Sequence, residues 1–106
     1  MDLARFLASL DENEAPKAAG PLLQALWYDA RGAWDRAHAL VQAQQGQDAA
    51  AVHAYLHRKE GDLSNADYWY ARAGRRRFEG DLQMEWRSLA AAFAAKEDAP
   101  GTGGEP

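Results

Sequence analysis

Cysteine and isoleucine are both absent from this chain of 106 residues. The lack of cysteine excludes disulfides, thiolate zinc sites and cysteine nucleophiles. Valine occurs only as Val41 and Val52, and no segment shows the period-two alternation of β-branched residues that is typical of a strand. We therefore expect an all-α protein.

Long apolar segments and a basic N-terminal region are missing too. No run approaches the ~20 apolar residues that span a bilayer, so no membrane segment is expected. The sequence begins Met1-Asp2-Leu3, with an acid where a signal peptide would be basic, and Asp11-Glu12 interrupts the apolar stretch that follows. Together with the lack of cysteine, these absences favour a cytoplasmic protein.

The recognisable catalytic patterns are also missing. Outside the first predicted helix the only hydroxyl side chains besides tyrosine are Ser64, Ser88 and Thr102, and none neighbours a histidine with a residue to orient it. Glycines are dense only in the C-terminal tail, so no phosphate-binding loop is present. We assign no catalytic residue and no cofactor. The net charge of −4 disfavours nucleic acid as a partner.

What is present is a substantial apolar core for one small domain. The chain is 47% hydrophobic and holds four Trp, four Tyr and three Phe, and its length leaves room for one domain. We expect a single helical domain over residues 1–97. The glycine-rich tail, residues 98–106, is expected to be disordered.

Apolar residues recur at helical spacing in six segments. Asp2 and Asp62 are placed as N-caps of the first and fifth helices, and Pro21 occupies the first position of the second helix. The third, fourth and sixth helices are expected near 34–46, 48–60 and 81–96. The residues expected in the core are Leu3, Phe6, Leu7, Leu10, Leu22, Leu23, Leu26, Trp27, Ala30, Trp34, Ala37, Leu40, Val41, Val52, Tyr55, Leu56, Leu63, Ala66, Tyr70, Ala73, Leu82, Trp86, Leu89, Ala90 and Phe93.

The chain contains an internal repeat. Residues 31–38 align with residues 60–67, so that Gly61 follows Gly32 by 29 residues and Ala66 follows Ala37 by the same 29. Glycine permits the left-handed turn between antiparallel helices, and a small alanine lets the two helices approach closely. This pattern predicts two helical hairpins, over about 21–46 and 48–74.

These residues resemble a known helical repeat. The residues that match the turn and second helix of the tetratricopeptide repeat are Gly61, Asp62, Leu63, Ala66, Tyr70 and Ala73, and the first copy keeps Gly32, Trp34, Ala37 and Val41. The segment 66–73 also resembles the A-x-x-W-Y-x-x-A of Sel-like repeats. The spacing is 29 where the tetratricopeptide family has 34, and the W-x-x-L-G-x-x-Y signature of its first helix is not met. The resemblance covers residues 21–74 and implies stacked hairpins that bind a peptide or protein.

A second resemblance covers the stretch from Leu26 to Arg75. This stretch is similar to a group of small bacterial proteins to which no activity is assigned. It therefore favours a bacterial-type protein and implies nothing about function.

The best candidate for site chemistry is a pair of histidines. His53 and His57 are separated by four residues, so they share a helix face and are able to chelate one metal ion, with His38 as a third ligand. Ala54 stands where the H-E-x-x-H motif has its glutamate, which removes the usual general base. The alternative is that the histidines only form hydrogen bonds between helices. A small metal-dependent or histidine-based enzyme using Glu60 is the rival function.

An aromatic and basic surface is the second candidate. Tyr68, Trp69 and Tyr70 are consecutive and cannot share one helix face, so at least one of them covers a second surface. The basic residues Arg58, Lys59, Arg72, Arg75, Arg76 and Arg77 lie near helix C-termini, where cations are stabilising in any case. Alternatively they hold a carboxylate or phosphate of a partner. In the tetratricopeptide family such residues hold peptide carboxylates, and Arg58 and Lys59 occupy comparable places.

We therefore predict a non-catalytic interaction or scaffold module. Its partner is expected to be a peptide, a protein or a second copy of the chain in a homodimer. An apolar patch should be exposed near Trp69 or Tyr55, with arginines around it. The residues predicted to bind are Tyr55, Arg58, Lys59, Trp69, Arg72 and Arg75. A third possibility is a nucleic-acid accessory protein that uses Arg72 and Arg75–Arg77.

Overall fold

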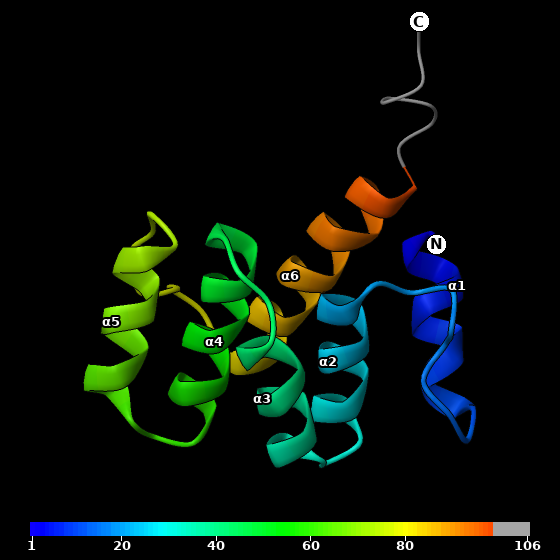
Figure 1. The fold of residues 1–106 in the computed structure, drawn as a ribbon, viewed down its shortest axis with the longest axis horizontal. Coiled ribbons are helices and arrows are strands. Elements are labelled where there is room, and N and C mark those ends of the chain that lie inside the picture. The colour runs from blue at the N-terminus through cyan, green and yellow to red at the C-terminus, as the bar shows by residue number, and fades with distance from the viewer. Residues whose placement is uncertain (99–106) are drawn as a thin grey trace, which may run out of the picture.

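The computed structural model describes residues 1–98 and is all-α over that range, as predicted. Its elements are α1 (Leu3–Ala8), a 3-10 turn η1 (Ser9–Asp11), α2 (Pro21–Ala30), α3 (Trp34–Gln42), α4 (Gln47–Lys59), α5 (Leu63–Arg72) and α6 (Leu82–Glu97), shown in Figure 1. The tail predicted to be disordered lies, from residue 99 onward, outside the described residues. None of the helices within residues 1–98 is long and apolar enough to cross a membrane.

Aspartates begin three of the helices. The carboxylate of Asp2 accepts a hydrogen bond from the Arg5 backbone N–H at 2.8 Å, and Asp62 accepts one from Asn65 at 3.3 Å. Asp81 does the same for α6, accepting from Met84 at 2.8 Å. Each bond satisfies a backbone donor that has no partner inside the first turn. The two predicted N-caps are confirmed.

The two glycines of the internal repeat occupy equivalent turns. Gly32 (φ +82°) and Gly61 (φ +90°) lie in the left-handed region, which glycine adopts without strain. The residue after each glycine donates its N–H back into the preceding helix, Ala33 to Tyr28 and Asp62 to His57, both at 2.9 Å. These turns fold α2 against α3 and α4 against α5, with the small residues of the repeat fully buried. Two hairpins are therefore present; the tetratricopeptide resemblance itself stays a prediction.

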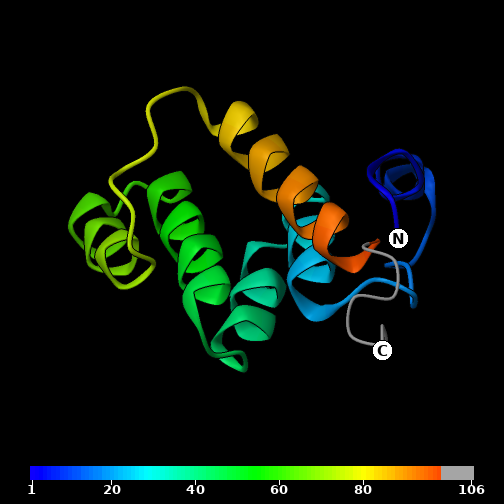
Figure 2. The same cartoon turned by 90° about the horizontal axis from the view of Figure 1, so that it is seen from above.

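Helix α4 is the centre of the fold. It packs against α2, α3, α5 and α6, and every residue from Ala49 to His57 is buried. A helix buried on all sides must be apolar all round or have its polar groups paired, and α4 combines four alanines with paired polar side chains. Figure 1 shows α2, α3, α4 and α5 following one another across the molecule. Helix α6 contacts both α2 and α4, and Figure 2 shows it along one side of the row of helices.

Helix α5 lies at the edge of this arrangement and packs mainly on α4. Its outer face is exposed, with Tyr68 at 53% and Leu63 at 43% of full exposure. The prediction that Leu63 belongs to the core is therefore wrong, as it is for Ala30. Both residues lie at an end of their helix, next to a hairpin turn.

The third helix ends earlier than predicted. The spacing predicts a helix to Gly46, but α3 stops at Gln42 and residues 43–46 form the turn into α4. Gly46 adopts φ +101°, a conformation that α-helix excludes. The glutamines of this turn are thereby placed beside the start of α4, where they take part in the site described next.

Candidate functional site

The three histidines of the chain come together between α3 and α4. We call His38, His53 and His57 the histidine cluster. The Nε2 atoms of His38 and His53 are 3.1 Å apart, and one nitrogen from each of the three rings lies within 4.8 Å of the other two. His53 and His57 are each 6% exposed and His38 is half-buried. His53 and His57 thus lie on one helix face with His38 opposite, as the spacing predicts.

Each ring of the cluster is held by a neighbour outside it. His38 stacks on Trp34 with ring centroids 4.8 Å apart, and the Trp34 indole N–H donates to the Leu56 carbonyl at 2.9 Å. His53 stacks on Trp69 at 3.9 Å. The Nδ1 of His57 lies 2.7 Å from a carboxylate oxygen of Glu60. These contacts fix the ring planes, so the cluster is preorganised.

Burial keeps two of the imidazoles neutral near pH 7. Burial first, and then the neighbouring rings of His38 and His57, lower the pKa of His53 to about 4. Burial and His57 also lower the pKa of His38, although Glu60 and Asp35 oppose this. Neutral imidazole has one donor and one acceptor nitrogen, so one ring of the His38–His53 pair donates and the other accepts.

A hollow of about 770 Å³ opens beside the cluster. We call it the amide hollow, because four glutamine side chains from the end of α3, the turn and the start of α4 contribute to it. Its lining is Gln42, Gln44, Gln45, Gly46, Gln47, Ala49, Ala50, His53, Trp69 and Arg72. It contains a cation and an aromatic face, and no carboxylate is among these residues.

Trp69 and Arg72 form the α5 wall of the amide hollow. The Arg72 guanidinium lies 5.3 Å from the Trp69 ring centroid and 5.7 Å from that of Tyr68. Arg72 also donates a hydrogen bond to the Tyr68 hydroxyl at 3.0 Å. Of the residues predicted to bind, Trp69 and Arg72 meet at the amide hollow, while Tyr55 and Lys59 line a smaller hollow of about 260 Å³ beside Asp29.

Tyr55 and Lys59 lie elsewhere and are already paired. The Tyr55 hydroxyl donates to Oδ2 of Asp29 at 2.7 Å, and Lys59 donates to Oδ1 at 2.9 Å. Asp29 is only 2% exposed and Tyr55 is buried. Burial and the bond to Asp29 raise the pKa of the Tyr55 phenol well above its usual range. Of the two places where an exposed apolar patch was expected, Trp69 or Tyr55, Tyr55 is itself buried.

Arg58 is paired in a matching way. It donates to Oε1 of Glu85 at 2.8 Å and to the Gly80 carbonyl, while the Tyr70 hydroxyl donates to Oε2 of the same glutamate at 2.6 Å. Glu85 is 3% exposed. Burial and this hydrogen bond raise the pKa of Tyr70 above its usual range. Arg58 therefore stabilises the contact between α4 and α6.

Sequence reasoning missed the two buried carboxylates. Both lie on an apolar stripe, since Asp29 continues the spacing of Leu22 and Leu26, and Glu85 falls between Leu82 and Leu89. An acid on the inward face of a helix predicts a buried polar network. That signal was available in the sequence.

The other arginines of the predicted basic set lie in the loop after α5. Arg77 forms a two-point ion pair with Asp67, with N–O distances of 3.0 and 2.8 Å, which lowers the pKa of Asp67 and raises that of Arg77. Arg75 and Arg76 are exposed in the loop after α5. The predicted basic set is therefore divided between internal ion pairs and the surface.

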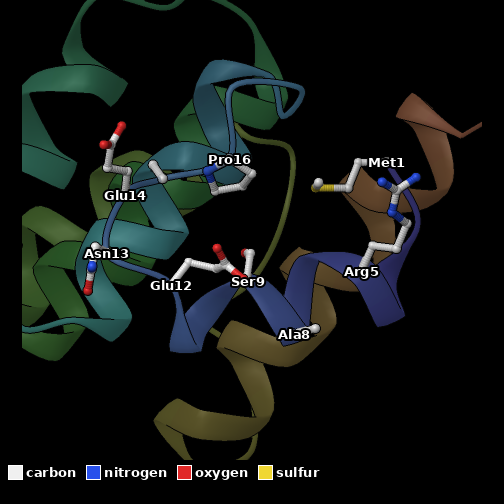
Figure 3. A pocket seen from close by; sticks show the side chains of 9 residues that line it. Met1, Arg5, Ala8, Ser9, Glu12, Asn13, Glu14 and Pro16 are labelled. Atoms are coloured by element: carbon white, nitrogen blue, oxygen red, sulfur yellow. The ribbon is translucent and has the colours of Figure 1, made fainter.

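A second hollow, of about 650 Å³, lies beside α1 and the segment that follows it (Figure 3). Arg5, Glu12 and Glu14 give it a mixed charge. None of the predicted site residues lines it, so it does not contribute to the candidate site.

Comparison with known proteins gives no relative for this chain. No family model matches it, and neither a curated protein nor a solved structure shows significant similarity.

Proposed function

We propose that this protein is a non-catalytic interaction module that binds an acidic peptide segment in the amide hollow. The observation that carries the proposal is the composition of the hollow. On a chain of net charge −4, it offers an arginine, a tryptophan face and four glutamines, and no carboxylate. A segment bearing aspartate or glutamate has the complementary charge.

The side chains of the amide hollow suit an extended peptide. A primary amide has two N–H donors and a carbonyl acceptor, so glutamines are able to pair with the peptide groups of a bound backbone. Tryptophan and arginine are the residues in which binding energy is most often concentrated at interfaces. Trp69 and Arg72 are adjacent at the rim of the hollow, and Arg72 is exposed.

The resemblance to tetratricopeptide repeats supports the same class of partner. In that family, cations hold the carboxylates of a peptide. In this chain Arg58 and Lys59 bond to Glu85 and Asp29. Because these two cations are already paired within the chain, we assign the partner's carboxylate to Arg72, the exposed arginine of the amide hollow.

The experiment is a selection from a random short-peptide library against the purified chain. We expect the selected peptides to be enriched in Asp and Glu. A resynthesised peptide should lose at least about tenfold in affinity for Arg72→Glu, because an attraction becomes a repulsion. Affinity should also weaken as salt is raised.

Arg87→Glu is the matched control. Arg87 is an exposed arginine of α6 that does not line the amide hollow, so the same change of charge there should leave affinity nearly unaltered. Selection of neutral or basic peptides would contradict the proposal. Equal losses in the two variants would also contradict it.

A further inference from the structure

We propose that His38, His53 and His57 form a binding site for a single Zn²⁺ ion. This inference concerns the histidine cluster alone and does not depend on the peptide proposal. Three imidazole ligands from two packed helices are a donor set that Zn²⁺ accepts. Within residues 1–98 no thiolate is available, so imidazole is the strongest ligand type that the chain offers.

The distances are compatible with a tetrahedral site. Zinc–nitrogen bonds of about 2.0–2.1 Å place two ligand nitrogens about 3.3 Å apart. The Nε2 atoms of His38 and His53 are already 3.1 Å apart, and one nitrogen from each of the three rings lies within 4.8 Å of the other two. Closing the cluster on an ion therefore requires a ligand nitrogen to move by about 1.5 Å at most.

Glu60 orients one ligand. Its carboxylate lies 2.7 Å from Nδ1 of His57, which leaves Nε2 as the nitrogen for the ion. A carboxylate on the far nitrogen of a metal-ligating histidine fixes its tautomer and raises its basicity. Glu60 is in this sense a positioning residue. The stacking of His38 on Trp34 and of His53 on Trp69 restrains the other two rings.

The site has a route to solvent. His53 belongs both to the cluster and to the lining of the amide hollow, and His38 is half-buried. An ion is able to enter from that side, and a water molecule would complete its coordination. Ala54 follows His53, so the glutamate that serves as general base in H-E-x-x-H sites is absent from this position.

The test uses the full chain without an affinity tag, treated with chelator and then titrated with ZnCl₂ by calorimetry. We expect one ion per chain. Because the ion binds the folded state, excess Zn²⁺ at about 100 times Kd should raise Tm by about 5 °C or more. An unchanged Tm in excess Zn²⁺ would overturn the proposal.

Matched variants locate the ion. His38→Gln and His53→Gln should each lose more affinity than the about 10–100-fold expected for Glu60→Gln, which removes only an orienting partner. Glu79→Gln, at an exposed loop position, is the control and should bind Zn²⁺ like the parent chain. Zinc binding that survives both histidine substitutions would place the ion elsewhere and overturn the proposal.

Co²⁺ provides a second readout that needs no variant. Loaded on the parent chain, Co²⁺ in a tetrahedral site of nitrogen ligands gives strong visible absorption bands, and addition of Zn²⁺ should remove them. The weak absorption of hydrated octahedral Co²⁺ would contradict a site built from this cluster. This measurement keeps the proposal testable if the histidine variants do not fold.

Discussion

The buried polar groups on the two sides of α4 have different kinds of partner. At about 100° per residue, His53 and His57 lie on one side of the helix, while Tyr55, Arg58 and Lys59 lie on the other. On the second side each of these three residues meets a carboxylate from another helix, either Asp29 or Glu85. On the first side two of the imidazoles meet each other, and the cluster adjoins a solvent-accessible hollow.

The two sides of α4 therefore have different roles, one in stability and the other in binding. Ion pairs that are complete within the chain hold helices together and leave nothing for a partner. A set of preorganised nitrogens beside an open hollow has capacity left for a ligand. Mutations on the carboxylate-paired side should therefore lower the free energy of unfolding. Mutations on the histidine side should mainly weaken ligand binding.

The largest expected effect on stability is at Glu85. Replacing it with alanine leaves the Arg58 guanidinium and the Tyr70 hydroxyl without their partner in a buried place, and we expect a loss of about 3 kcal/mol in the free energy of unfolding. Urea denaturation measures this loss. Glu79→Ala is the control and should change stability by less than about 0.5 kcal/mol. Similar values for the two variants would contradict a structural role for Glu85.

The second effect is the pH dependence of the metal-free chain. The folded-state pKa of His53 is about 4, below the ordinary value of 6.5, so the unfolded chain binds more protons between these values. Stability should therefore fall as the pH is lowered from 6.5 to 4, by roughly 3 kcal/mol at most from this group. His38 on α3, His57 on α4 and Arg72 on α5 are the basic groups that surround it.

Urea midpoints of the parent chain and of His53→Gln, measured in chelator across this range, isolate the contribution. Both proteins share the pH dependence of all other groups, which cancels in the difference. The parent should lose more stability than the variant over this pH interval. Parallel curves would show that His53 is not the responsible group.

The third effect compares the two hairpin turns. Gly32→Ala and Gly61→Ala each place a side chain at a positive φ where no neighbouring atom interferes, so only backbone strain should be felt. We expect losses of about 1 kcal/mol that are nearly equal in thermal denaturation. Clearly unequal losses would show that the turns are not energetically equivalent.

The helices and turns were predictable because their signals are local. The N-caps Asp2 and Asp62 and the turn glycines Gly32 and Gly61 act within a few residues of their own position. The pairing of His53 with His57 is also local, since it follows from helical periodicity. The exposure of Leu63 was not predictable in this way, because it depends on which elements cover the start of α5.

The roles of the basic residues could not be read from the sequence in the same way. Arg58 and Lys59 resemble free cations at a helix C-terminus until α6 and α2 bring Glu85 and Asp29 against them. Those partners are 27 and 30 residues away in the chain. Side-chain spacing predicts that an acid faces inward, but it does not identify the cation that the acid will meet.

The smallest effect on stability is expected at Arg72. Its side chain lies on the surface and its interactions are with Tyr68 and Trp69, so Arg72→Ala should change the free energy of unfolding by less than about 0.5 kcal/mol. The same variant should weaken binding of a selected acidic peptide. A large loss of stability would show that Arg72 has a structural role, and it would weaken the assignment of this residue to a partner.

The most direct test of the difference between the two sides of α4 is the nitrogen NMR spectrum of the imidazoles. All three histidines of the chain belong to the cluster, so every imidazole signal reports on it. We predict neutral rings for His38 and His53 at pH 7 without metal, and a change in all three rings after one equivalent of Zn²⁺. Spectra that stay the same after the addition would contradict the account.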